Sequence, residues 1–219
     1  RWTSSAKSGV GTALSVASPV WFTLSHGILN EIYYPRVDSA CTRDFGFLVT
    51  GPDGYFSEEK RDCEQETTPL EDGVPAFSIV NTALDGAYRI RKQIISDPAR
   101  AVVLQRISFS ALKGRTRDYR VTALLAPHLV NAGASNSAWI GEFEGAPALF
   151  ASGRSRYLAL VSSAPWRAMS AGFVGTSDGW QQLSRHGRLA DQYQRADDGN
   201  VALAGEIDFS GGDGSVVLA

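Results

Sequence analysis

Residues 77–91 read FSIVNTALDGAYRIR, and this stretch indicates the fold more clearly than any other. Two runs suited to β-strands, residues 77–82 and 88–91, lie on either side of the pair Asp85-Gly86. An Asp-Gly pair suits a tight turn whose central residues need a positive φ, because glycine carries no Cβ and meets no steric penalty there. The stretch therefore predicts a β-hairpin.

Turn and strand patterns of the same kind fill the rest of the chain. Alternation of apolar and polar residues predicts strands at 119–125 and 201–209, each with one face in the core and the other in water. In the second strand, Glu206 and Asp208 are expected on the solvent-exposed face. Further strands are predicted at residues 18–24, 28–34, 45–50, 101–110, 138–143, 148–151, 157–163 and 215–219. Further turns are predicted at Asp53-Gly54, Asp72-Gly73, Asp178-Gly179, Asp198-Gly199 and Asp213-Gly214.

One short helix is predicted late in the chain. Helical spacing relates Trp180, Leu183, Gly187 and Ala190. The preceding Thr176-Ser177-Asp178 supplies side chains suited to an N-cap. Many strands with one late helix predict an all-β fold, a large antiparallel β-sandwich, as a single domain over residues 1–219.

Composition excludes several classes of partner. The formal net charge of -2 gives no bulk attraction to nucleic acid or to an anionic membrane. No apolar run approaches the roughly 20 residues that span a bilayer, and no signal-peptide pattern is present. Because the chain begins at Arg1 and not at Met, we expect its true N-terminus to be missing or processed away.

The cysteines and histidines do not form a recognisable metal motif. The three histidines, His26, His128 and His186, lack ligand spacing, so we expect neither a metal nor a cofactor. Cys41 and Cys63 could pair or both stay free, and the sequence leaves these alternatives open. The acidic turn at residues 197–200 lacks the spaced ligands of a calcium loop and is interpreted as a hairpin turn.

Several segments carry a family resemblance. The longest is residues 18–38, SPVWFTLSHGILNEIYYPRVD. It resembles the N-terminal domain of bacterial glucoamylases and glucodextranases of glycoside hydrolase family 15. Similar stretches are residues 2–13 (WTSSAKSGVGTA), 42–44 (TRD), 56–61 (FSEEKR), 126–129 (APHL) and 199–205 (GNVALAG), so the resemblance runs through essentially the whole chain.

The resemblance implies a super-sandwich of the galactose-mutarotase-like kind, followed in the parent enzyme by an (α/α)6 barrel. In that family the barrel carries two catalytic glutamates and releases glucose from the non-reducing ends of α-glucans with inversion. None of the barrel motifs occurs in this chain. We therefore expect a non-catalytic domain whose partner is the catalytic barrel, which it stabilises and whose entrance it helps to shape. Family members that act on polymers are commonly exported, which favours an extracellular or periplasmic location and leaves a cytoplasmic one open.

Site residues are predicted in two groups. Residues of the resembling motifs are assigned to structure or to an interface: His26, Asn30, Glu31, Pro35, Asp38, Arg43, Asp44 and His128. Aromatic residues are weighed as sugar contacts because a pyranose has an apolar C–H face that stacks on a ring: Trp21, Tyr33, Tyr34, Trp139, Trp166 and Trp180. Large aromatics more often fill cores. Trp21 and Phe22 are assigned to the core, and Tyr33, Tyr34 and Trp139 are kept as the sugar candidates.

Catalysis by this chain is the weaker interpretation. An inverting hydrolase needs two carboxyl groups about 6.5–9.5 Å apart. The acidic residues that could supply such a pair are Glu31, Asp38, Asp44, Glu58 and Glu59. Their sequence neighbours Arg36, Arg43, Lys60 and Arg61 predict ion pairs instead.

Two alternative functions remain at the level of sequence. One is a carbohydrate-binding module that holds starch or dextran. The other is a mutarotase-like sugar enzyme that uses His26 with Glu31, or His128 with a distant carboxylate, although fold likeness alone is a weak argument for it. An isolated domain of this type is also expected to expose an apolar docking face and to self-associate through it.

Overall fold

The hairpin at residues 77–91 forms as predicted. In the computed structural model, which describes residues 6–210 and 214–219, β7 (Phe77–Ala83) pairs with β8 (Tyr88–Ser96) in antiparallel register. Gly86 in the turn has a φ of 72°, the left-handed conformation that glycine adopts without strain. Residues 2–5 of the opening motif and Asp213 of the last predicted turn lie outside the described residues.

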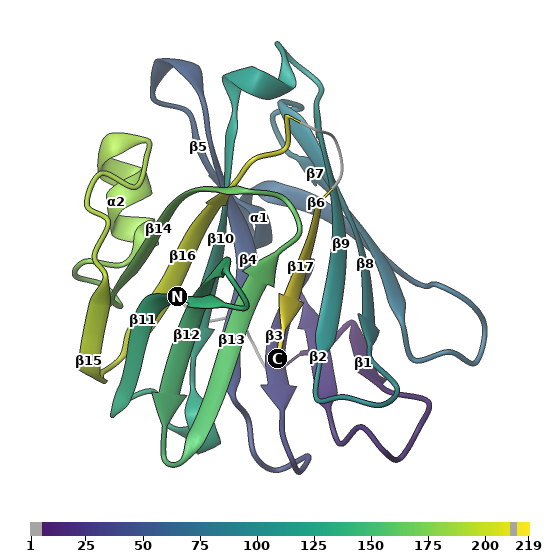
Figure 1. The fold of residues 1–219 in the computed structure, drawn as a ribbon. Coiled ribbons are helices and arrows are strands. Elements are labelled where there is room, and N and C mark those ends of the chain that lie inside the picture. Colours follow the sequence, from purple (N-terminus) through teal and green to yellow (C-terminus); the bar gives the residue numbers. More distant parts are fainter. Residues whose placement is uncertain (1–5, 211–213) are drawn as a thin grey trace.

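This hairpin belongs to a nine-stranded antiparallel sheet, which lies in front in Figure 1. Its strand order is β15-β11-β12-β13-β17-β9-β8-β7-β6. The C-terminal strand lies in the middle of this sheet, paired with β13 and β9. The remaining bounds are β6 (Cys63–Pro69), β9 (Val103–Ala111), β11 (Asn136–Phe143), β12 (Ala146–Gly153), β13 (Arg156–Ser162), β15 (Arg195–Gly199) and β17 (Gly214–Leu218).

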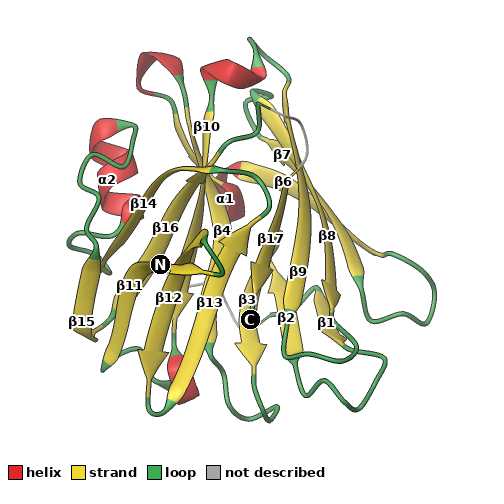
Figure 2. Ribbon diagram, viewed as in Figure 1, coloured by secondary structure: helices red, strands yellow, loops and turns green. Residues whose placement is uncertain are grey.

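An eight-stranded antiparallel sheet packs behind it, in the order β1-β2-β3-β4-β10-β16-β14, with β5 beside β4. Its strands are β1 (Gly9–Thr12), β2 (Trp21–Ser25), β3 (Ile28–Tyr33), β4 (Thr42–Thr50), β5 (Phe56–Glu58), β10 (Arg120–Pro127), β14 (Trp166–Phe173) and β16 (Val201–Ile207). The helices are α1 (Glu59–Asp62), α2 (Gly179–His186) and the 3-10 turns Pro52–Gly54, Thr116–Asp118 and Leu129–Asn131. Strands dominate the molecule, as Figure 2 shows, and the prediction of an all-β sandwich is confirmed.

The core lies between the two sheets. One continuous cluster of buried side chains joins them, and its largest fully buried members include Tyr88, Phe22, Phe45, Phe47, Ile79, Ile90 and Ile94. Aromatic packing continues toward one end, where Tyr88 stacks on Phe109 with ring centroids 5.7 Å apart. The alternation read from the sequence therefore identifies correctly the apolar residues of β10 and β16 that face the core.

A buried ion pair links the two sheets within this core. Lys92 Nζ of β8 lies 2.6 Å from Glu59 Oε1 of α1, and neither side chain is exposed to solvent. The other oxygen of Glu59 accepts a hydrogen bond from the backbone N–H of Phe47, at 3.0 Å. Asn81 of β7 donates to both Glu59 and the Gly27 carbonyl, to which Lys92 also donates. The short helix α1, where the chain crosses from one sheet to the other, is thereby fixed to both.

Some local predictions are wrong. The late helix ends at His186, because Gly187 adopts a φ of 65° and caps it, so Ala190 lies outside the helix. Glu206 was assigned to a solvent-exposed face, yet it is 1% exposed, and its Oε1 lies 3.0 Å from Arg120 Nη1. Trp21 was assigned to the core and is 38% exposed, whereas its neighbour Phe22 is fully buried as predicted.

The two cysteines are both free and buried. The Cys63 sulfur lies 3.3 Å from the Tyr88 hydroxyl. Burial raises the pKa of Cys63 to about 12, and burial also raises the pKa of Cys41. Among the described residues, no helix is long and apolar enough to cross a membrane.

Candidate functional site

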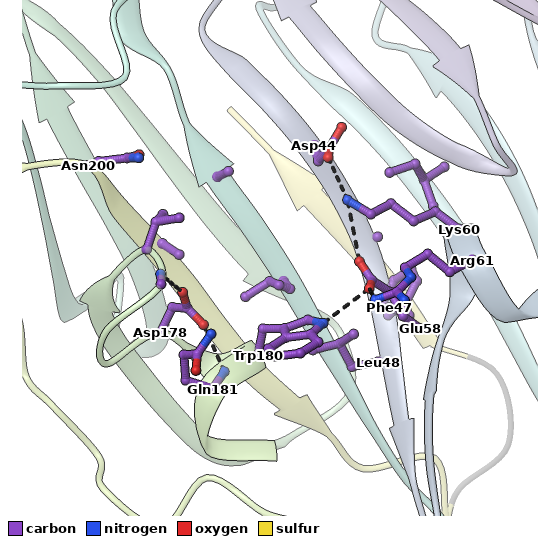
Figure 3. Close-up of a pocket in the computed structure, with 17 residues that line it drawn as sticks. Asp44, Phe47, Leu48, Glu58, Lys60, Arg61, Asp178, Trp180, Gln181 and Asn200 are labelled. Carbon is purple, nitrogen blue, oxygen red and sulfur yellow. Dashed lines mark hydrogen bonds and ion pairs between the residues drawn. The ribbon is translucent and has the colours of Figure 1, made fainter. Parts of the chain in front are cut away.

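The outer face of the eight-stranded sheet carries a groove of about 400 Å3 (Figure 3). Because successive side chains of a strand point to opposite faces, Phe45 of β4 enters the core while Gly46 and Leu48 face outward. Helix α2 packs over Leu48 and covers part of this face. The groove lies beside the covered part, and its apolar lining consists of Ile28, Gly46, Phe47, Leu48, Leu124, Ala126, Val174 and Ala202.

Helix α2 forms one wall of the groove. It begins where the predicted N-cap, Asp178, accepts a hydrogen bond from the backbone N–H of Gln181 at 2.9 Å. Leu183 faces the sheet and is 1% exposed, which holds the helix in place. Trp180 and Gln181 then line the groove from the first turn, and Trp180 packs edge-to-face on Phe56 with centroids 5.5 Å apart.

The opposite wall is a charged cluster from β4, β5 and α1. Lys60 Nζ lies 2.8 Å from Asp44 Oδ2 and 3.3 Å from Glu58 Oε1. Arg61 Nη1 lies 3.4 Å from Glu58 Oε2, and the Trp180 indole N–H donates to this oxygen at 3.1 Å, joining the two walls. Asp44 and Glu58 are 7% and 8% exposed, so both carboxylates are held in fixed positions. The predicted ion pairs of Asp44 and Glu58 with neighbouring cations are present.

Several predicted site residues gather on the same sheet next to this wall. Asn30 of β3 donates to Asp44 Oδ1 at 3.2 Å. Glu31 accepts from Thr23 Oγ1 at 2.6 Å and from Lys7 Nζ at 2.5 Å. Burial opposes ionisation of Glu31, but the hydrogen bonds from Lys7 and Thr23 outweigh it and hold the pKa of this carboxyl below its usual value.

His128 and Tyr33 each lie within electrostatic range of both Glu31 and Arg43. Burial lowers the pKa of His128, the positive charge of Arg43 lowers it further, and Glu31 opposes both. Burial raises the pKa of Tyr33, to which the charge of Glu31 adds. Histidine and carboxylate thus share one region, with the Glu31 carboxylate engaged by Lys7 and Thr23.

Other predicted residues lie elsewhere. Asp38 pairs with Arg36 at 3.0 Å in an exposed turn, and Tyr34 in the same turn is 36% exposed. Pro35 lies between them in sequence and forms no part of the groove lining. His26 lies in the turn between β2 and β3, with its Nδ1 2.5 Å from the Ser25 hydroxyl.

Trp139 lies in the other sheet, on β11. Its ring stacks on Phe150 with centroids 5.5 Å apart and an interplanar angle of 14°. The Arg195 guanidinium carbon lies 5.5 Å from the Trp139 ring centroid. The sugar candidates Tyr33, Tyr34 and Trp139 therefore do not line the groove, whereas Trp180, which was weighed and not retained, does.

Two polar residues of the groove were not predicted as site residues from the sequence. Gln181 lies on the first turn of α2, and Asn200 lies between β15 and β16. They reach one groove only because α2 folds back over the sheet. In Figure 3, Asn200 and Gln181 lie across the groove from Asp44 and Lys60.

The groove therefore offers fixed hydrogen-bonding groups around an apolar floor. Asp44 and Glu58 are acceptors, while Lys60 and Arg61 are donors and cancel their charge. Within the described ranges, no group of three or more His, Cys, Asp or Glu side chains is arranged to hold a metal ion.

Fold and groove together define a β-sandwich domain with a built polar recess on one sheet. The family model described as "Glucodextranase, domain N" matches residues 1–219. The chain belongs to this family of glucodextranase N domains. The family resemblance read from residues 18–38 is thereby confirmed.

Similar proteins extend this result. A glucoamylase from Clostridium sp. (strain G0005) is 33% identical over 208 residues, which are 95% of this chain and 30% of the glucoamylase. The crystal structure of a bacterial glucoamylase complexed with acarbose superposes with a TM-score of 0.97 at 32% identity, covering 100% of this chain and 32% of the other. A family GH92 glycosyl hydrolase shares the fold alone, with a TM-score of 0.55 at 8% identity, covering 100% of this chain and 31% of the other. The chain thus spans about a third of the length of the glucoamylases it resembles.

Proposed function

We propose that this chain is a non-catalytic domain of an enzyme that hydrolyses α-glucans and releases glucose from their non-reducing ends. In this proposal the domain stabilises the catalytic (α/α)6 barrel and helps to shape its entrance. One observation carries it: the N-domain family model matches residues 1–219 of the chain, while the chain covers only 30% of a glucoamylase. The remaining two-thirds of such an enzyme have the room for a separate catalytic unit.

The charges of the groove agree with a role other than hydrolysis. Glycoside hydrolysis with inversion needs one carboxylic acid and one carboxylate that act on opposite sides of the glycosidic bond. Here the carboxylates of Asp44 and Glu58 share a single ammonium group, that of Lys60. A shared cation fixes both carboxylates as hydrogen-bond acceptors, which suits binding and stability.

The test is glucose release by the purified chain from maltotetraose and from dextran. We expect none, while a longer protein in which this domain precedes its barrel should release glucose from one of them. Release by the chain alone, abolished by one carboxylate substitution such as Glu58→Gln, would overturn the proposal. The stabilising role is checked separately, because removal of the domain should lower the melting temperature of the barrel, and an unchanged value would contradict it.

A further inference from the structure

We infer that the groove between α2 and the charged wall is a binding site for a short, neutral gluco-oligosaccharide. The identity of the sugar as a glucan rests on the proposed function, while the chemical class of the ligand rests on the groove itself. The sugar candidates Tyr33, Tyr34 and Trp139 lie outside this site.

The shape of the groove suits a small ligand. Its volume of about 400 Å3 falls within the roughly 300–1,000 Å3 typical of small-molecule sites. The recess exists because Gly46, Ala126 and Ala202 present little or no side chain on neighbouring strands, at the part of the sheet that α2 leaves open. A flat, ring-shaped ligand can therefore approach the sheet closely.

The lining is amphipathic in the way that a pyranose is. Leu124 is one of the apolar side chains of the lining. The indole of Trp180 lies between the two walls and donates to Glu58 (Figure 3). Polar groups stand around them: the amides of Gln181 and Asn200 on one side, and the cluster of Asp44 on the other. A pyranose presents C–H groups on its face and hydroxyls at its rim, so both parts of the lining find a complement.

The charge balance favours an uncharged ligand. Two carboxylates, from Asp44 and Glu58, face two cations, from Lys60 and Arg61, so the wall carries no net charge. The fifth charged residue of the lining, Asp178, accepts hydrogen bonds from the backbone N–H groups of Gln181 and Gly175 and is committed to capping α2. The lining as a whole thus has three carboxylates and two cations, and the positive end of the α2 dipole partly offsets the charge of Asp178. Such a nearly balanced lining offers little complementary potential to select a charged ligand.

The polar groups of the wall are also preorganised. Asp44 is held by Lys60 and Asn30, and Glu58 by Lys60, Arg61 and Trp180. Ligand binding then orders few side chains, which reduces the entropic cost of association. The carboxylates of Asp44 and Glu58 are thus held in place to accept hydrogen bonds from the hydroxyl groups of a bound sugar.

The inference is tested by calorimetric titration of the 219-residue chain with maltotetraose and with isomaltotetraose. We expect saturable binding in the millimolar range for one of them. The double variant Q181A/N200A, which removes the two groove amides, should weaken it roughly tenfold, since each lost neutral hydrogen bond has a modest net effect. Alanine is a good helix former and Asn200 is exposed, so this variant should keep the fold.

The matched control is Q192A/Q194A, which removes two exposed amides of the neighbouring segment outside the groove and should leave affinity unchanged. A second readout is the indole N–H resonance of Trp180, assigned by Trp180→Phe, which should move on titration while that of Trp139 stays in place. Absence of saturable binding, unchanged affinity of Q181A/N200A, or equal binding of an oligogalacturonate would each overturn the inference. These outcomes are separable from failure of the proposed function, which is measured by glucose release and by barrel stability.

Discussion

At the scale of single residues, the interior of this sandwich contains one pair of opposite charges that is fully buried among the described residues. Glu59 and Lys92 sit between the sheets with no exposed side-chain surface, and the Gly27 carbonyl and the Phe47 N–H complete their hydrogen bonding. The sequence did not predict this pair: Glu59 was weighed only among the acidic candidates near Lys60 and Arg61, and Lys92 was not singled out. Only the crossing of α1 from one sheet to the other brings them within 2.6 Å.

Lys92→Met should lower the free energy of unfolding by about 3–5 kcal/mol, because it leaves the Glu59 carboxylate buried without its cation. Urea unfolding followed by tryptophan fluorescence measures this loss. The double variant E59Q/K92M removes both charges and retains an acceptor for the Phe47 N–H, so it should recover a substantial part of the stability. A single variant as stable as the unmodified protein would show that the pair contributes little.

At the scale of elements, helix α2 converts a plain sheet face into a groove. Its start is local, since Asp178 was predicted as an N-cap from its type and position and accepts the Gln181 N–H. Its position is not local, since Leu183 must pack against Leu48 of β4 to bring Trp180 to Glu58. The end of the helix was mispredicted because helical spacing continued through Gly187, which instead adopts a left-handed conformation and caps the helix.

Asp178→Ala should destabilise the protein by about 1 kcal/mol, since loss of an N-cap side chain leaves backbone N–H groups of the first turn without a partner. Thermal unfolding monitored by circular dichroism gives the difference. Asp178→Asn retains a capping oxygen and serves as the control, with most of the stability preserved. Equal destabilisation by both substitutions would indicate that the negative charge of Asp178, and not the cap, is the stabilising feature.

For the whole molecule, the two sheets enclose both cysteines without joining them. Cys41 and Cys63 are buried and free, and burial raises the pKa of Cys63 to about 12. Thiolate is the reactive form of cysteine, so a thiol in this environment is protected in two ways, by exclusion of the reagent and by protonation.

Labelling of these thiols should therefore follow unfolding. Native protein at neutral pH should react slowly with a thiol reagent that liberates a chromophore. Denatured protein should react at once at both cysteines, and the absorbance should then show two equivalents of chromophore per chain. Addition of denaturant below the unfolding transition is the control and should accelerate labelling in proportion to the unfolded fraction. If denatured, unreduced protein showed no thiol, the cysteines would be paired and the free state seen here would be wrong.

The sequence by itself determined the class of fold and the local devices that build it. Alternation in residues 119–125 predicted which side chains face the core, Asp85-Gly86 predicted a hairpin, and Asp178 predicted the start of a helix. These features depend on neighbours a few residues apart, so they can be read along the chain. The motif at residues 18–38 also identified the family.

The tertiary structure alone decided the order of the strands and everything that depends on it. Three features join residues that are far apart in sequence. Strand β17 pairs between β13 and β9, and Glu206 is buried against Arg120. The groove brings together Asp44, Lys60, Trp180 and Asn200. A period of two says which face a residue occupies but not which strand lies beside it or what covers that face. The groove is a product of pairing and coverage, and for that physical reason its residues emerged only when the chain was seen folded.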